Sequence, residues 1–110
     1  MNKIIISALL NILSFIGFSQ SNQSELIATK ISQKMQDSLS LTENQKMQVF
    51  NINMHLSNQK DSARQQYSGS SLGFQIQKVV NMRDSLYHGI LPYNKFLFYR
   101  QQKRNLITNN

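Results

Sequence analysis

The sequence predicts an all-α protein of about four helices, of which the second is the longest. Three observations support this fold class. The 110 residues include only one Pro and four Gly, so few positions interrupt a helix. Apolar residues recur at three- and four-residue steps, which is the period of a helix with a buried face. No stretch alternates apolar and polar residues in the way that a half-buried strand does.

Residues 1–19 are typical of a secretory signal peptide. Lys3 supplies a positive charge, and the run from Ile4 to Phe18 is mostly apolar. Gly17 and Ser19 place small residues at the first and third positions before a cleavage site. This order of a charged start, an apolar run and small residues is what signal peptidase recognises.

The apolar run is shorter than the roughly 20 residues that span a bilayer, and Asn11 lies near its middle. We therefore expect cleavage after Ser19 and export to the periplasm, or beyond the cell; an uncleaved membrane anchor is the alternative. Residues 20–107 then form a single helical domain, and residues 108–110 a frayed tail. Because the chain has no Cys, it forms no disulfides, and self-association is an expected aid to the stability of so small a domain.

The first helix of this domain is expected to begin at Ser24, whose hydroxyl suits an N-cap, and to end near Leu39. Its apolar residues fall on one stripe, which consists of Ile27, Ala28, Ile31, Met35 and Leu39. Ser40 and Leu41 then break the helical pattern.

The stretch Leu41-Thr42-Glu43-Asn44-Gln45 predicts the start of the second helix. The Thr42 side chain can accept a hydrogen bond from a free backbone N–H, and Gln45 can bond back to the N–H of Thr42. This reciprocal arrangement is a capping box. We expect the helix that it starts to run to about Gln66 or Tyr67.

Two apolar stripes run along this long second helix. Met47, Phe50 and Met54 lie on one side of it. The opposite side carries Val49, Ile52, Leu56, Ala63 and Tyr67. A helix with two apolar sides needs two partners, so one stripe suits the core of the subunit and the other a dimer mate or a client protein. The alternative is that both stripes are core and dimer interface.

Ser68-Gly69-Ser70-Ser71 is the predicted linker to the third helix, because Gly and Ser favour turns. The third helix shows a single apolar stripe, formed by Leu72, Ile76, Val79, Val80, Leu86, Tyr87 and Ile90. Arg83 falls within this stripe. We expect its stem to cover apolar surface and its guanidinium to reach water or a carboxylate.

A fourth helix is expected from Pro92, a residue that suits the first turn, to about Leu106. We expect Phe98 and Tyr99 to point away from its main apolar face, which consists of Tyr93, Phe96, Leu97 and Ile107. The basic last third, Arg100 to Arg104, suits the negative end of the helix dipole. A basic helix with aromatic residues also suits weak contact with a membrane surface.

With Leu-Thr-x-x-Gln after a short first helix, the sequence resembles the Spy/CpxP group of small bacterial envelope proteins. Leu91 stands where a second such motif is expected, but Pro92 and Lys95 replace its Thr and Gln. The resemblance implies an elongated helical hairpin or cradle, paired as an antiparallel dimer in the periplasm. It implies an ATP-independent chaperone or an envelope-stress accessory protein. It also implies a structural role, not a catalytic one, for the motif residues Leu41, Thr42 and Gln45.

A chaperone of this kind holds clients on apolar surface that adapts in shape, and positive charge attracts acidic segments. The chain has 12 Lys and Arg against 5 Asp and Glu, a net charge of +7, and the expected partners are unfolded or acidic envelope proteins. The candidate client-binding residues lie on the second helix: Lys46, Met47, Phe50, Met54 and Arg64. The alternative for the three apolar residues is the subunit core. A structural or interaction protein without client binding is the second function class.

Other function classes find little support in the residue pattern. The acidic residues are scattered and there is no Cys nucleophile, so we expect no catalytic site and no cofactor. Export and the dispersed basic residues argue against nucleic acid as a partner. His55 and His88 leave open a metal-responsive sensor of the same family. Neither histidine has a ligand partner at a suitable spacing, however, so we expect no metal site.

Overall fold

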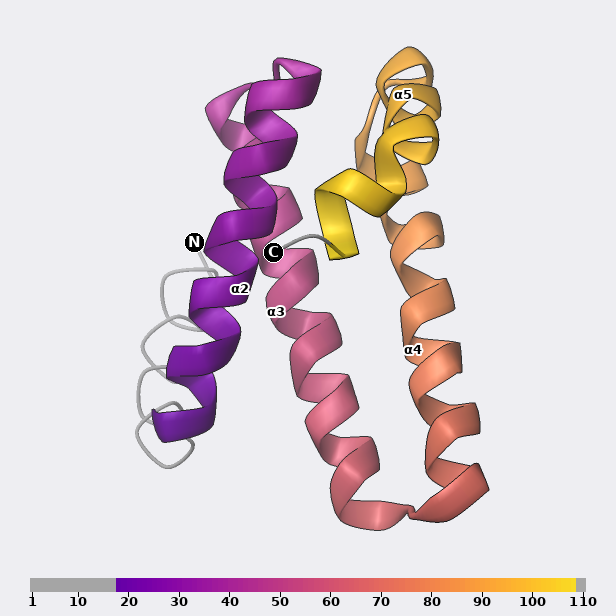
Figure 1. Ribbon diagram of the computed structural model, residues 1–110. Coiled ribbons are helices and arrows are strands. Elements are labelled where there is room, and N and C mark those ends of the chain that lie inside the picture. Colours follow the sequence, from indigo (N-terminus) through magenta and orange to yellow (C-terminus); the bar gives the residue numbers. More distant parts are fainter. Residues whose placement is uncertain (1–17, 109–110) are drawn as a thin grey trace, which may run out of the picture.

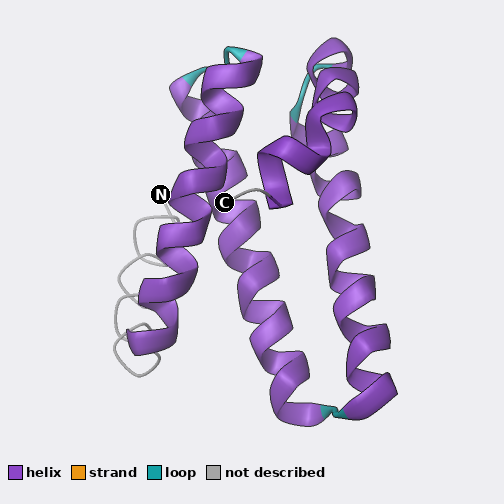
Figure 2. Ribbon diagram, in the orientation of Figure 1, coloured by secondary structure: helices purple, strands orange, loops and turns teal. Residues whose placement is uncertain are grey.

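The computed structural model describes residues 18–108, and the side chains of residues 23–107. Its elements are α2 (Phe18–Leu39), α3 (Glu43–Gln66), α4 (Gly69–Ile90), α5 (Tyr93–Lys103) and a π-helical turn, η1 (Arg104–Thr108). All of the secondary structure in this part of the chain is helical (Figure 2), which confirms the predicted fold class. Most of the predicted signal peptide, residues 1–17, and the end of the predicted tail, residues 109–110, lie outside the described residues.

The helices form an open, flat arrangement with α3 in the middle. α3 packs against α2 on one side and α4 on the other, and α5 with η1 returns from the end of α4 to α2 (Figure 1). The principal extents are 41, 37 and 23 Å. None of the described helices combines the length and the apolar character that spanning a bilayer needs.

The start of α2 differs from the prediction. The helix already includes Phe18 and Ser19, and Ser24 is a buried residue of its interior instead of its N-cap. No Pro or Gly between Phe18 and Ser24 interrupts the helix, and the Ser24 hydroxyl accepts a hydrogen bond from Ser57 Oγ on α3 at 2.8 Å. This hydrogen bond between α2 and α3 accounts for the burial of the Ser24 side chain.

The end of α2 is a Schellman-type turn. The backbone N–H of Leu41 donates to the carbonyl oxygen of Gln36 at 3.3 Å, and Ser40 between them has a φ of 56°. This is the left-handed conformation that glycine usually supplies after a helix. The turn reverses the chain and places α3 antiparallel to α2.

The capping box at the start of α3 is present as the sequence predicts. The N–H of Gln45 donates to Thr42 Oγ1 at 3.1 Å, and the N–H of Thr42 donates to Gln45 Oε1 at 2.9 Å. The helix then runs to Gln66, with Tyr67 as its C-cap. Both ends therefore agree with the expected bounds.

The predicted four-residue linker is wrong, because α4 begins at Gly69 and only Tyr67 and Ser68 separate the two helices. The sharp turn consists of these two residues in extended conformation and of Gly69 with a φ of 59°. Ser70 and Ser71 then fit the first turn of α4, where serine is well tolerated.

The rotation of α5 also differs from the prediction. Tyr93 and Leu97, expected on the buried face, are exposed, whereas Tyr99 is fully buried against Phe96. The reason is a contact with α4: the Tyr99 hydroxyl donates to Asp84 Oδ1 at 2.7 Å. Its ring meets Tyr87 edge to face at 4.8 Å between centroids, an arrangement that aromatic pairs prefer.

Asp84 also forms ion pairs with the cationic end of α5. Lys103 Nζ donates to Asp84 Oδ2 at 2.9 Å, and Arg100 Nε lies 4.0 Å from the same oxygen. Burial raises the pKa of Asp84, but the hydrogen bonds from Lys103 and Tyr99 and the charges of Lys103 and Arg100 outweigh this, and the pKa lies below its ordinary value. Burial and the hydrogen bond to Asp84 raise the pKa of Tyr99 well above its ordinary value.

The core lies where α2, α3, α4, α5 and η1 meet. It consists of Ile31, Met35, Leu39, Leu41, Val49, Tyr87, Leu91, Phe96, Tyr99, Leu106 and Ile107. The α2 stripe is buried as expected, except for the exposed Ile27. On α3 the stripe with Val49 and Leu56 is the inner one, while Tyr67 at its end is exposed.

Candidate functional site

A shallow hollow of about 250 Å³ between α2 and α3 contains three of the predicted client-binding residues. Met47 is 58 % exposed there, Phe50 is half-buried, and Lys46 stands beside them. The ammonium of Lys46 donates to Gln33 Oε1 at 2.7 Å, which fixes the cation at the α2 side. The remaining lining residues are Thr29, Ser32 and Glu43. We call this site the Met47 hollow.

Two further candidates lie elsewhere on α3. Met54 is half-buried and does not line the Met47 hollow. Arg64 follows Met47 by 17 residues, which is about 26 Å along a helix at a rise of roughly 1.5 Å per residue. Arg64 therefore lies outside the Met47 hollow, and its contact with a client stays a prediction.

The motif residues hold the α2–α3 hairpin together and do not line the Met47 hollow. Leu41 is buried in the core, while Thr42 and Gln45 bond each other at the start of α3. Gln36 supports this turn from α2, since its side-chain amide donates to the carbonyl oxygen of Leu41 at 3.3 Å and to Glu43 Oε2 at 2.9 Å. The structure thus assigns these residues contacts that shape the hairpin.

Lys95, which replaces the Gln of the expected second motif, bonds the end of α2. Its ammonium donates to the carbonyl oxygen of Leu39 at 2.9 Å and to that of Ser40 at 2.7 Å. A cation at the C-terminus of a helix satisfies carbonyl groups that have no partner within the helix. This contact joins α5 to the turn before α3, and the sequence offered no local signal for it.

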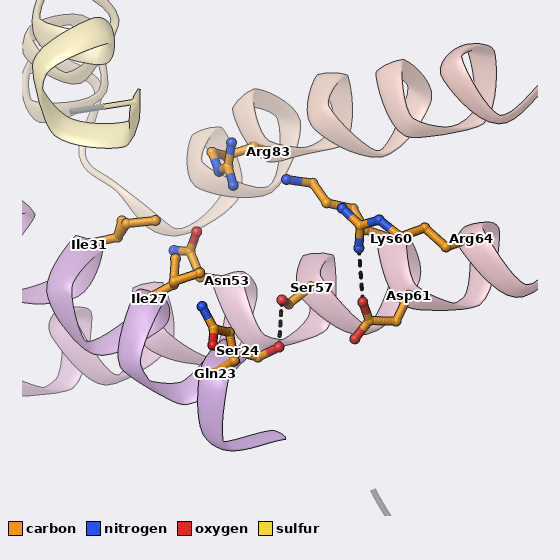
Figure 3. A pocket seen from close by; sticks show the side chains of 10 residues that line it. All are labelled: Gln23, Ser24, Ile27, Ile31, Asn53, Ser57, Lys60, Asp61, Arg64 and Arg83. Atoms are coloured by element: carbon orange, nitrogen blue, oxygen red, sulfur yellow. Dashed lines mark hydrogen bonds and ion pairs between the residues drawn. The ribbon is translucent and has the colours of Figure 1, made fainter. Parts of the chain in front are cut away.

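A second site lies where α2, α3 and α4 face one another, and its volume is about 280 Å³ (Figure 3). Three of the side chains that line it are cationic and one is acidic. The residues are Gln23, Ser24, Ile27, Ile31, Asn53, Ser57, Lys60, Asp61, Arg64 and Arg83. We call this site the cationic pocket.

Positive charge in the cationic pocket exceeds negative charge. Arg64 Nη1 pairs with Asp61 Oδ1 at 2.9 Å, and no carboxylate of residues 23–107 forms an ion pair with Lys60 or Arg83. Burial, followed by the charges of Arg83 and Arg64, lowers the pKa of Lys60, although Asp61 acts in the opposite direction. Figure 3 shows the amine of Lys60 directed toward the guanidinium of Arg83.

Arg83 does not adopt the predicted arrangement. It is only 6 % exposed, its buried Nε has no hydrogen-bond partner, and no carboxylate of residues 23–107 forms an ion pair with it. The cause is its position inside the apolar stripe of α4, which turns the side chain into the space between the helices. A charged residue within an apolar stripe was the sequence signal for this pocket.

Asn53 connects the floor of the pocket to α4. Its side-chain amide donates to the carbonyl oxygen of Val49 at 2.8 Å and to the Tyr87 hydroxyl at 2.6 Å. Its Oδ1 is buried without a partner. Because the Val49 carbonyl can only accept, the NH₂ group must face it, and this fixes Oδ1 as the free acceptor.

The two histidines lie apart from both sites. His55 is exposed, and His88 is exposed with its ring edge to face on Phe96 at 4.8 Å between centroids. Within the described part of the chain, His, Asp and Glu side chains form no group of three that could hold a metal ion.

No protein-family model, curated protein or solved structure matches the chain. The function is therefore argued from the two sites described above, the Met47 hollow and the cationic pocket.

Proposed function

We propose that the protein is an ATP-independent, chaperone-like protein of the bacterial periplasm, akin to the Spy/CpxP group. It holds unfolded or acidic envelope proteins through apolar and basic surface, or assists the envelope stress response in this way. The observation that carries the proposal is the Met47 hollow, where a well-exposed Met lies beside Phe50 and the cation of Lys46.

The chemistry of the hollow suits a client of variable sequence. A methionine side chain is flexible and polarisable, so it adapts to apolar groups of different shapes. A neighbouring ammonium attracts acidic segments and speeds encounter. The hollow is shallow, which suits brief contact with an extended chain better than enclosure of a small molecule.

The test is suppression of aggregation. A reduced or heated client protein is mixed with an equimolar amount of the purified protein without nucleotide, and light scattering is followed. We expect scattering to fall, and the double variant Met47→Ser/Phe50→Ser to lose most of this effect. Unchanged scattering in the presence of the wild type contradicts the proposal.

A matched control separates the hollow from general apolar exposure. Phe74 on α4 is also strongly exposed but lines neither site. Phe74→Ser is therefore expected to retain the activity. If Phe74→Ser and the double variant lose activity equally, client binding does not depend on the Met47 hollow.

A second candidate function is that of a structural protein that acts through fixed self-association, and α5 supports it. Tyr93, Leu97 and Phe98 are exposed, and Tyr93 and Leu97 share one helix face at a four-residue spacing, which suits an interface with a second copy. Sedimentation over a range of dilutions tests this. We expect Tyr93→Ser/Leu97→Ser to shift a dimer toward monomer while Leu26→Ser, another exposed apolar residue, does not; a monomeric wild type contradicts this function.

A further inference from the structure

We propose that the cationic pocket is a binding site for a small oxyanion, a carboxylate or a phosphate, held by the guanidinium of Arg83 and the ammonium of Lys60. This inference goes beyond client binding. The pocket and the Met47 hollow share no lining residue, so each can be tested without the other.

The first argument is charge. Three cations face a pocket in which the one carboxylate, that of Asp61, already pairs with Arg64. Lys60 and Arg83 repel each other, and each has lost part of its hydration through burial. An anion between them offsets both costs, because a charge-assisted hydrogen bond is strongest where water is excluded.

The second argument is a buried donor without a partner. Arg83 is more than nine-tenths buried, and its Nε–H has no acceptor. Buried donors without partners are uncommon, since leaving one unpaired is costly. Guanidinium groups match the planar pair of oxygens in a carboxylate and the oxygens of a phosphate.

The third argument concerns what else the ligand carries. Asn53 lines the same pocket, and its Oδ1 is a buried acceptor without a donor. An oxyanion that also has a hydroxyl satisfies both groups, with its oxygen on Arg83 and its O–H on Asn53. Hydrogen phosphate and 2-hydroxy acids meet this requirement, whereas a simple dicarboxylate does not.

The fourth argument is size. A volume of about 280 Å³ lies just below the range for sites of drug-sized molecules, roughly 300 to 1,000 Å³. Ile27 and Ile31 on α2 supply an apolar wall. The pocket therefore suits a small anion with a few carbon atoms or a free phosphate, not a segment of folded protein.

The experiment is a calorimetric titration of the purified protein at constant ionic strength with inorganic phosphate, malate and succinate. Malate and succinate differ by one hydroxyl. We expect saturable binding of one phosphate or malate per chain, and at least about tenfold weaker binding of succinate. The stronger of the phosphate and malate responses identifies the source of the oxyanion. Failure of both to saturate overturns the proposal.

Two variants with the same change of charge locate the site. Lys60→Gln is expected to weaken binding by about tenfold or more, whereas Lys78→Gln, on the exposed side of α4, is expected to leave it within about twofold. An equal loss in both variants shows that only net charge matters and overturns the site. Arg83→Lys keeps the charge and removes the Nε donor, and its circular dichroism spectrum reports whether it folds.

The titration also distinguishes failure of this site from failure of client binding. Lys60→Gln is expected to suppress client aggregation as well as the wild type does, because Lys60 does not line the Met47 hollow. Loss of anion binding with retained suppression supports two separate sites. Loss of suppression without loss of anion binding contradicts the assignment of Lys60.

Discussion

The contact between Tyr99 and Asp84 allows a quantitative test of how α5 is held. In the variant Tyr99→Phe the ring stays, so the edge-to-face contact with Tyr87 and the packing of the ring in the core are retained. Only the hydroxyl is lost, and with it the 2.7 Å hydrogen bond to Asp84 Oδ1.

The expected loss of stability is about 1.5 kcal/mol. Hydrogen bonds to charged groups contribute roughly 1.5 to 3 kcal/mol. The lower end applies here, because the Asp84 side chain is 27 % exposed and keeps its bond from Lys103. In a domain of this size, roughly 4 to 8 °C of melting temperature correspond to 1 kcal/mol, so Tyr99→Phe is expected to melt about 6 to 12 °C lower than the wild type.

The assay is urea unfolding followed by circular dichroism at neutral pH. Tyr93→Phe is the matched control, because Tyr93 is 68 % exposed and its hydroxyl loss is expected to change the free energy of unfolding by no more than about 0.5 kcal/mol. A loss in Tyr99→Phe no greater than that of the control refutes the assigned contact.

The pH dependence provides a second test of the same contact. The pKa of Asp84 is lower in the folded state than its ordinary value of 3.8, so its contribution is present above pH 3.8 and is lost as the pH falls through the folded-state pKa. The difference between wild type and Tyr99→Phe is therefore expected to shrink in acid. A difference that is unchanged at acidic pH shows that Asp84 is not the acceptor.

Three further outcomes are expected from thermal or urea unfolding. Ser40→Gly relieves the positive φ of Ser40 and is expected to raise the free energy of unfolding by roughly 0.5 to 1 kcal/mol, whereas Ser40→Ala does not raise it. Lys95→Met removes two hydrogen bonds to the end of α2 and is expected to cost about 1 kcal/mol, with Lys78→Met, at an exposed cation, as the near-neutral control. Lys60→Gln is expected to stabilise the fold at neutral pH. Because the pKa of Lys60 is lowered in the folded state, the advantage should disappear as the pH rises toward 10.5, and a constant advantage contradicts this explanation.

The parts of the fold that the sequence predicts are those that depend on neighbouring residues. The capping box at Thr42 and the end of α3 near Gln66 follow from local backbone preferences. Helical periodicity identifies the two apolar stripes of α3, but which of them faces the core is seen only in the structure. The predicted linker is too long, since two extended residues followed by Gly69 with its positive φ complete the turn.

The parts that the sequence does not predict depend on contacts between distant residues. The rotation of α5 is set by Asp84 on α4 and by the carbonyl groups at the end of α2, which Lys95 bonds. Periodicity alone places Tyr93 inward and Tyr99 outward, the reverse of what the structure has. The cationic pocket draws on three helices for the same reason, and only Arg83 within an apolar stripe indicated it.

The return of η1 to α2 has a consequence for the order of folding. The core includes Ile31 near one end of the described chain and Leu106 and Ile107 near the other, so it is completed only by a loop that encloses nearly the whole domain. The α2–α3 and α3–α4 hairpins enclose much shorter loops, and the entropy cost of closure rises with loop length. The hairpins are therefore expected to form first, and the apolar centre is complete only once η1 has packed against α2.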